Sequence, residues 1–67
     1  MLQESTISGK SYEADAAVYF YNVVQARKYM EQGAIPLDVF PSQGKIIFVF
    51  KKEDHVRLKD KWISGGI

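Results

Sequence analysis

The side chains that could carry acid–base chemistry are scattered along this chain. The only histidine, His55, has Asp54 beside it, but a catalytic histidine also needs a nucleophile and a group that orients its ring. The sequence nominates neither, so His55 fits a surface or boundary position better than an active site. The adjacent Glu53 and Asp54 would not face each other on a helix. A place in the first turn of a helix, near its positive end, accounts for both.

No residue set for a metal, a cofactor or a phosphate group is present in the sequence. The chain has no cysteine and one histidine, which is a poor ligand set for a structural zinc. The glycines form no phosphate-binding loop, since Gly65 and Gly66 stand at the end of the sequence and Gly9 stands alone. We therefore expect a protein that is not an enzyme and uses no cofactor.

Basic side chains interleaved with aromatic ones suggest nucleic-acid binding as a second hypothesis. The candidate contacts are Lys45, Lys51, Lys52 and Arg57. The aromatic residues that could stack on bases are Tyr19, Tyr21, Phe48 and Trp62. However, nine basic and eight acidic residues give a net charge of +1, whereas a dedicated polyanion binder normally has a clear basic excess. Ordinary solvated charges are the better interpretation.

The segment over residues 35–50, IPLDVFPSQGKIIFVF, predicts a β-hairpin that is apolar on both faces. One face would carry Ile35, Leu37, Val39, Ile46, Phe48 and Phe50. The other would carry Phe40, Ile47 and Val49, with Asp38 as its main polar residue. A sheet with one face in water alternates between apolar and polar residues, and this segment does not. Both faces must therefore be covered.

A chain of 67 residues has little material with which to cover two faces. A domain of this size buries about 60% of the surface that its unfolded chain exposes, and its core supplies about 3–5 kcal/mol. Two short helices can shield one face, which leaves the other for a partner, most simply a second copy of the chain. The predicted interface is Phe40, Ile47 and Val49, helped by Tyr19 and Tyr21. The alternative is one helix on each face and a monomer.

Residues 14–32 allow two interpretations. Residues 16–21 end in the β-branched and aromatic types that are typical of strands. Asn22 and Gln25 have the spacing of a helix capping box, so a helix would follow over residues 23–32 and end at Gly33. The alternative is one continuous helix over residues 15–32. We favour the strand followed by a helix.

The remaining elements complete a small single α+β domain. Residues 41–44 predict a four-residue turn, residues 45–50 a strand, and residues 53–63 a final helix. The order is then β-α-β-β-α, or α-β-β-α if the first strand is helical. The predicted core is Ala26, Met30, Leu37, Val39, Ile46, Phe48, Phe50, Leu58 and Trp62.

Residues 1–13 are polar and predict an irregular, flexible lead-in to a domain over residues 14–67. No apolar run approaches the roughly 20 residues that span a bilayer. The first residues also lack the features of a signal peptide. We expect a cytoplasmic protein that does not bind membranes.

Residues 19–63 resemble a group of short uncharacterised domains from Gram-positive bacteria and their phages and prophages. The similarity is carried by the helix sequence YNVVQARKYMEQG over residues 21–33. It continues through Pro36, Gly44, Lys45, residues 48–50 and Trp62. The resemblance implies a setting in a mobile element or a Gram-positive cytosol, and no particular activity.

Two hypotheses about function follow. The leading one is a non-enzymatic protein-interaction module that is homodimeric and, in a phage or prophage, binds a host or defence protein. The alternative is an accessory protein that binds nucleic acid through the lysines and arginines of the hairpin and the helices.

Overall fold

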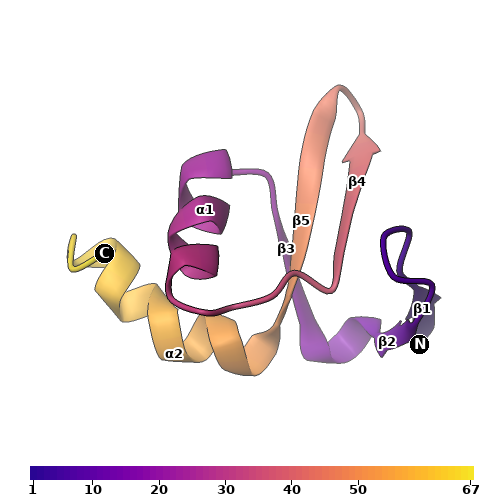
Figure 1. Ribbon diagram of the computed structural model, residues 1–67, viewed down its shortest axis with the longest axis horizontal. Helices are drawn as coiled ribbons and strands as arrows, with labels where there is room; N and C mark the ends of the chain where they lie inside the picture. The colour runs from indigo at the N-terminus through magenta and orange to yellow at the C-terminus, as the bar shows by residue number, and fades with distance from the viewer.

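The computed structural model describes all of residues 1–67 and contains two antiparallel sheets and two α-helices. A three-stranded sheet carries both helices on one side and a small two-stranded sheet on the other (Figure 1). The elements are β1 Leu2–Glu4, β2 Ser11–Glu13, β3 Ala17–Phe20, α1 Val23–Glu31, β4 Asp38–Ser42, β5 Lys45–Lys51 and α2 Lys52–Ile63. A 3-10 turn, Ala14–Ala16, joins β2 to β3. The predicted α+β class is confirmed, and from β3 onward so is the order β-α-β-β-α.

Strand β5 lies at the centre of the three-stranded sheet, between β3 and β4. Phe48 stands opposite Phe20 on β3 and Val39 on β4, while its neighbour Val49 stands opposite Tyr19 and Asp38. Side chains alternate along a strand, so Phe48 and Phe50 share the side that the helices cover, which we call the helix face. The other side, with Ile47 and Val49, is called the second face.

Helix α1 begins and ends where local signals place it. The Asn22 side chain accepts hydrogen bonds from the backbone N–H groups of Val24 at 3.0 Å and Gln25 at 3.1 Å. Gly33 follows the helix with φ +93°, in the left-handed region that favours glycine. The strand followed by a helix is therefore confirmed, and the continuous helix over residues 15–32 is wrong.

The turn between β4 and β5 is shorter than predicted. Ser42 pairs with Lys45, which leaves a two-residue turn in which Gln43 has φ 53° and Gly44 has φ 79°. Positive φ at both central residues is the type I′ geometry that matches the twist of the two strands. The predicted four-residue turn is wrong because Pro41 belongs to β4, an outer strand, where a missing N–H is tolerated.

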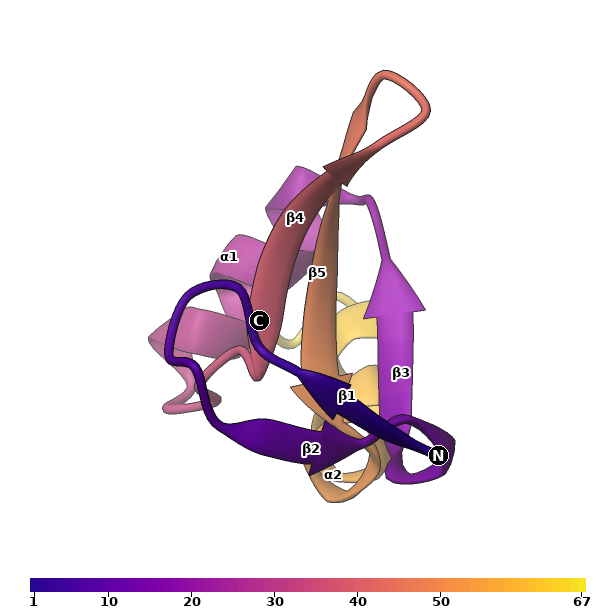
Figure 2. The same ribbon diagram turned by 90° about the vertical axis from the view of Figure 1, so that its right-hand side faces the viewer.

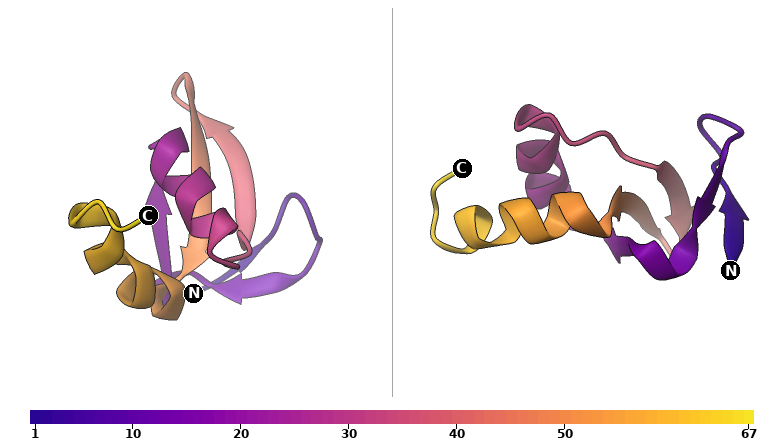
Figure 3. Two further views of the ribbon diagram at one scale, coloured as in Figure 1. Left: turned by 60° about the vertical axis from the view of Figure 1, so that its left-hand side comes forward. Right: turned by 90° about the horizontal axis from the view of Figure 1, so that it is seen from below.

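The core lies between the helix face and the two helices, which pack against each other (Figure 3). Tyr29, Phe50 and Leu58 have no exposed surface, and Ala26 and Ala34 complete the buried cluster. The Phe20 ring stacks on Phe50 with centroids 5.4 Å apart and meets Tyr29 edge-on at 5.5 Å. Aromatic pairs of this geometry stabilise a core beyond the area that they bury.

The predicted core is right in part. Ala26, Phe50 and Leu58 are fully buried, and Trp62 is half-buried against the core cluster. Leu37, Val39 and Phe48 are half-buried. Met30 and Ile46 are 40% and 46% exposed and do not belong to the core. Tyr29 takes the place that the pattern gave to Met30, because α1 is rotated so that Ala26 and Tyr29 face the sheet.

Residues 1–13 form a β-hairpin instead of the irregular segment that the sequence predicted. Strands β1 and β2 pair through Leu2 with Glu13, Gln3 with Tyr12, and Glu4 with Ser11. The hairpin crosses the second face near the beginning of β4 and leaves the β4–β5 turn uncovered (Figure 2). Both helices therefore lie on one face, as the dimer hypothesis assumed, but the chain itself covers part of the other.

Candidate functional site

Asp38, the first residue of β4, attaches the β1–β2 hairpin to the second face. Its Oδ1 accepts hydrogen bonds from the Thr6 hydroxyl at 2.6 Å and from the Thr6 backbone N–H at 2.9 Å. The Val39 N–H donates to the same oxygen at 2.9 Å. Asp38 is 2% exposed while Thr6 is exposed, so these bonds are partly buried, and together they constrain the hairpin.

The carboxylate of Asp38 is charged at neutral pH. Burial alone would raise the pKa of Asp38, but the bonds from the Thr6 hydroxyl and from the N–H groups of Thr6 and Val39 favour the ionised form. Together they bring the pKa below its ordinary value. The ion pairs of the chain involve Glu13, Asp15, Glu31 and Asp54, so no cation of this chain neutralises Asp38.

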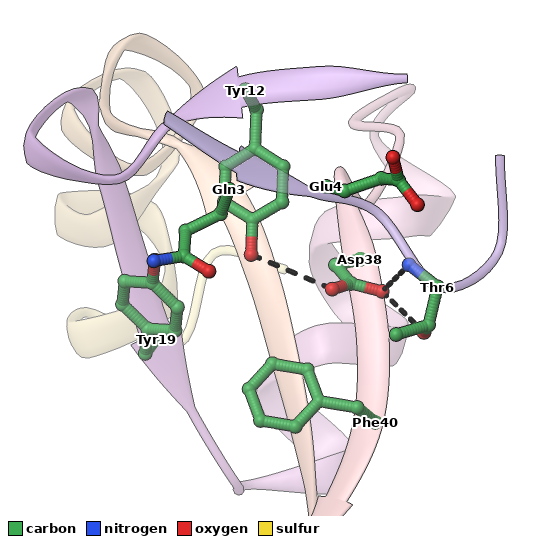
Figure 4. A pocket seen from close by; sticks show the side chains of 7 residues that line it. All are labelled: Gln3, Glu4, Thr6, Tyr12, Tyr19, Asp38 and Phe40. Carbon is green, nitrogen blue, oxygen red and sulfur yellow. Dashed lines mark hydrogen bonds between the residues drawn. The ribbon is translucent and has the colours of Figure 1, made fainter. Parts of the chain in front are cut away.

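A cavity of about 370 Å³ opens between the hairpin and the second face (Figure 4). It is lined by Gln3, Glu4, Thr6, Tyr12, Tyr19, Asp38 and Phe40. Tyr12 reaches down from β2, while Tyr19 and Phe40 come from β3 and β4 of the sheet below. The cavity therefore combines three aromatic rings with two carboxylates.

The Tyr12 hydroxyl is the one hydrogen-bond donor to the second oxygen of Asp38. Its distance to Oδ2 is 3.5 Å, at the outer limit for a hydrogen bond. Burial and the nearby Tyr19 and Asp38 raise the pKa of Tyr12 to about 12, so this ring stays neutral. Oδ2 thus keeps unused acceptor capacity on the side of the cavity.

The predicted interface residues divide into three groups. Val49 has no exposed surface, so it is not available to a partner. Phe40 and Ile47 are half-buried. Tyr19 and Tyr21 are 45% and 58% exposed, and the Lys45 ammonium lies 3.9 Å from the centre of the Tyr21 ring, in cation–π contact.

The candidate nucleic-acid contacts do not gather in one place. Lys45 begins β5 and Lys51 ends it, with Lys52 following at once, so the two ends are about 20 Å apart at the usual rise per residue of a strand. Arg57 points its guanidinium at Asp54, 3.3 Å away in the same helix. These four side chains form no continuous basic surface.

His55 belongs to a small polar cluster inside the helix layer. The Gln25 amide donates to the Tyr29 hydroxyl at 3.1 Å, and that hydroxyl lies 3.0 Å from His55 Nδ1. Because Tyr29 accepts from Gln25, its own proton is free for Nδ1, which fits a neutral ring. Burial, helped by the charge of Lys59, lowers the pKa of His55. The boundary position predicted for this half-buried histidine is confirmed.

The structure contains neither a cluster of metal-ligating side chains nor a membrane-spanning helix. Nowhere do three His, Asp or Glu side chains come together as a metal site requires. Neither helix has the length and apolar character needed to cross a bilayer.

Thr6 and Tyr12 were not predicted as site residues from the sequence, and Asp38 was noted only as the main polar residue on one face of an apolar hairpin. The one local signal was the dipeptide Ser8-Gly9, which is typical of turns and which connects the two halves of the β1–β2 hairpin. Nothing in residues 1–13 indicates the contact with Asp38, which lies 32 residues from Thr6 in the sequence.

The fold and the site define a small α+β domain with an aromatic, acidic cavity beside a partly exposed sheet face. No known protein family, curated protein or solved structure matches this chain. Proposals about its function therefore start from the geometry described above.

Proposed function

We propose that this chain is a non-enzymatic protein-interaction module that acts as a homodimer through the open part of its second face. The supporting observation is the exposure of apolar side chains there. Tyr19 and Tyr21 are 45% and 58% exposed, and Phe40 and Ile47 are only half-buried. Exposed apolar residues that share one face are typical of binding surfaces.

The position of the β1–β2 hairpin decides which part of the second face is available. The hairpin covers the end of the sheet where β4 begins, and the end near the β4–β5 turn stays open (Figure 2). Phe40 and Ile47 are paired across β4 and β5 toward that open end. The proposed interface is therefore smaller than the one predicted from the sequence, because Val49 is buried and does not belong to it.

A second copy is the simplest partner for this surface. A two-fold dimer places the same residues against each other and closes without further assembly. Tyr19, Phe40 and Ile47 are themselves uncharged, and the carboxylates nearest to them, those of Asp38 and Glu4, line the cavity beside the hairpin. The additional contact also compensates for the small core of a domain of this size.

Sedimentation of the wild type and two matched variants tests the dimer. Ile47→Asp puts a charge on the open second face, whereas Ile63→Asp makes the same change at a side chain that is 77% exposed at the end of α2. We expect the wild type and Ile63→Asp to be dimers at low micromolar concentration and Ile47→Asp to be a monomer, with circular dichroism confirming that each is folded. A monomeric wild type, or a folded Ile47→Asp dimer, contradicts the proposal.

In the phage or prophage setting that the resemblance implies, the module would bind a host or defence protein. A pulldown from a Gram-positive lysate with the wild type, Ile47→Asp and Ile63→Asp as baits tests this part. We expect a protein that is retained by the wild type and by Ile63→Asp and lost with Ile47→Asp. Equal retention by all three baits would place the binding surface elsewhere.

A further inference from the structure

The buried charge of Asp38 is the most demanding feature of the cavity. A buried carboxylate is costly unless it is paired with a cation or fully hydrogen-bonded. Oδ1 of Asp38 accepts three hydrogen bonds, but Oδ2 has only the Tyr12 hydroxyl at 3.5 Å. The side chain is 2% exposed, lines the cavity, and has no basic partner in the chain.

The walls of the cavity supply a second, independent feature. Tyr12, Tyr19 and Phe40 line it from three different strands. The face of an aromatic ring is electrically negative and attracts a cation that lies over it. Glu4, at the rim, adds a second carboxylate that takes part in none of the ion pairs of the chain.

We propose that this cavity binds an organic cation, the ammonium or guanidinium head of a lysine or arginine side chain presented by a protein partner. The rings of Tyr12, Tyr19 and Phe40 surround the apolar stem and the head, and Asp38 Oδ2 and Glu4 accept its hydrogen bonds. A volume of about 370 Å³ is at the small end of the roughly 300–1,000 Å³ found for ligand sites, which suits one side chain.

The chemistry of the walls selects an organic cation over a metal ion. Calcium takes six to eight oxygen ligands and magnesium requires an octahedral set, whereas much of this cavity is aromatic carbon. No cluster of three metal-ligating side chains occurs here or elsewhere in the chain. Aromatic rings beside carboxylates are the combination that recognises ammonium groups.

The assignment of the cation to a protein partner rests on the proposed function, but the affinity of the cavity for a cation does not. Titrations of the ¹⁵N-labelled protein with N-acetyl-lysine amide, N-acetyl-arginine amide and neutral N-acetyl-glutamine amide at constant ionic strength measure that affinity alone. We expect saturable shifts at Tyr12, Tyr19 and Phe40 with one or both cationic probes, and none with the neutral probe. The stronger probe distinguishes an ammonium from a guanidinium site.

Matched variants separate the cavity from a general effect of charge. Glu4→Gln removes a rim carboxylate, and Glu53→Gln makes the same change at an exposed site on α2. Glu4→Gln should weaken the binding of the cationic probe about two- to five-fold, the size expected for one exposed charge pair, and Glu53→Gln should leave it unchanged. Tyr19→Leu should weaken it by about the same factor, through the loss of one cation–π contact.

Three outcomes would overturn the cation site: no saturable shifts with either cation, equal shifts with the neutral probe, or equal weakening by Glu4→Gln and Glu53→Gln. None of these results depends on sedimentation. A monomer that binds the cationic probes would refute the proposed homodimer and retain the cavity. A dimer that does not bind the probes would support the homodimer and refute the cation site.

Discussion

Replacing Thr6 by valine tests how the β1–β2 hairpin is attached to the sheet. Valine has nearly the same shape but lacks the hydroxyl, which lies 2.6 Å from Asp38 Oδ1 and 3.0 Å from the Val39 carbonyl oxygen. The hydroxyl has one proton, and the closer, charged oxygen of Asp38 receives it. A hydrogen bond to a charged group contributes about 1.5–3 kcal/mol. The backbone N–H of Thr6 still donates to Asp38 in the variant.

We expect the lower end of this range, about 1.5 kcal/mol at pH 7, because Thr6 is itself exposed and the vacated site can take up water. For a domain with roughly 3–5 kcal/mol of stability, this is a large fraction. With an unfolding slope of about 1 kcal/mol/M in urea, the midpoint should fall by about 1.5 M.

The pH dependence of this loss identifies its cause. The folded pKa of Asp38 is lowered from its ordinary value of 3.8, so its ionised form stabilises the fold above that value, and this contribution is lost as the pH falls through the folded pKa. The Thr6 hydroxyl is one source of the lowering. The difference in stability between the wild type and Thr6→Val should therefore shrink in acid, toward the roughly 0.5–1.5 kcal/mol of a neutral hydrogen bond.

Urea unfolding at several pH values, together with an NMR titration of the Asp38 carboxyl carbon, measures both effects. Ser8→Ala is the matched control, because its hydroxyl accepts only from Lys10 within the same hairpin and does not touch Asp38. The reasoning is refuted if Thr6→Val leaves the midpoint unchanged, or if the pKa of Asp38 does not rise in that variant.

Three further changes probe the helix layer. The folded pKa of His55 is lowered from 6.5, so its neutral form stabilises the fold above about pH 6.5, and this contribution is lost as the pH falls through the folded pKa. His55→Gln should therefore flatten the pH dependence of urea unfolding in that window. An unchanged profile would show that His55 is not the source of the pH dependence. Gly33→Ala should cost about 1 kcal/mol from backbone strain at φ +93° alone, since an added Cβ would meet no atom within 4 Å; a neutral effect in thermal unfolding would contradict this. Phe50→Ala should lower the free energy of unfolding by about 3–5 kcal/mol and leave the chain largely unfolded. Phe48 is half-buried, so Phe48→Ala should cost clearly less. The reverse order in unfolding followed by circular dichroism would show that Phe48 contributes more to the core than Phe50.

The parts of the fold that the sequence predicted are those with local causes. Asn22 caps α1 because its side chain reaches two N–H groups within the next three residues, and Gly33 ends the helix because few other residues adopt its φ. These signals need no knowledge of the rest of the chain. The β4–β5 turn was misjudged through Pro41, which resembles a turn residue but occupies an outer strand.

The parts that the sequence missed depend on contacts between distant segments. Met30 and Tyr29 are neighbours on one helix, and only the angle at which α1 meets the sheet decides which of them is buried. Strands β1 and β2 have three residues each and almost no buried side chains, so they show no apolar alternation. Their position comes from the bonds between Thr6 and Asp38, which is why the cavity could not be predicted from residues 1–13.

The same bonds also determine how copies of this chain can associate. In the β4–β5 hairpin the bonded pairs alternate, so the backbone groups of Val39 and Pro41 face away from β5. The Val39 N–H donates to Asp38, and the Thr6 hydroxyl oxygen lies 3.0 Å from the Val39 carbonyl oxygen and shields it from another strand. Pro41 has no N–H. The outer edge of β4 is therefore a poor template for another strand, which is how natural sheets avoid open-ended assembly.

Strand β3 forms the opposite edge of the sheet, and it pairs only with β5. With the β4 edge blocked, a chain of sheets in which β4 of one copy joins β3 of the next is disfavoured. Association through the open second face, or an antiparallel pairing of β3 with its own copy, remains, and both arrangements close as two-fold dimers. Tyr19 belongs to β3 and also projects from the second face, so it would lie in or beside the contact in either case. Ile47→Asp separates the two arrangements, because Ile47 lies on β5, away from the β3 edge.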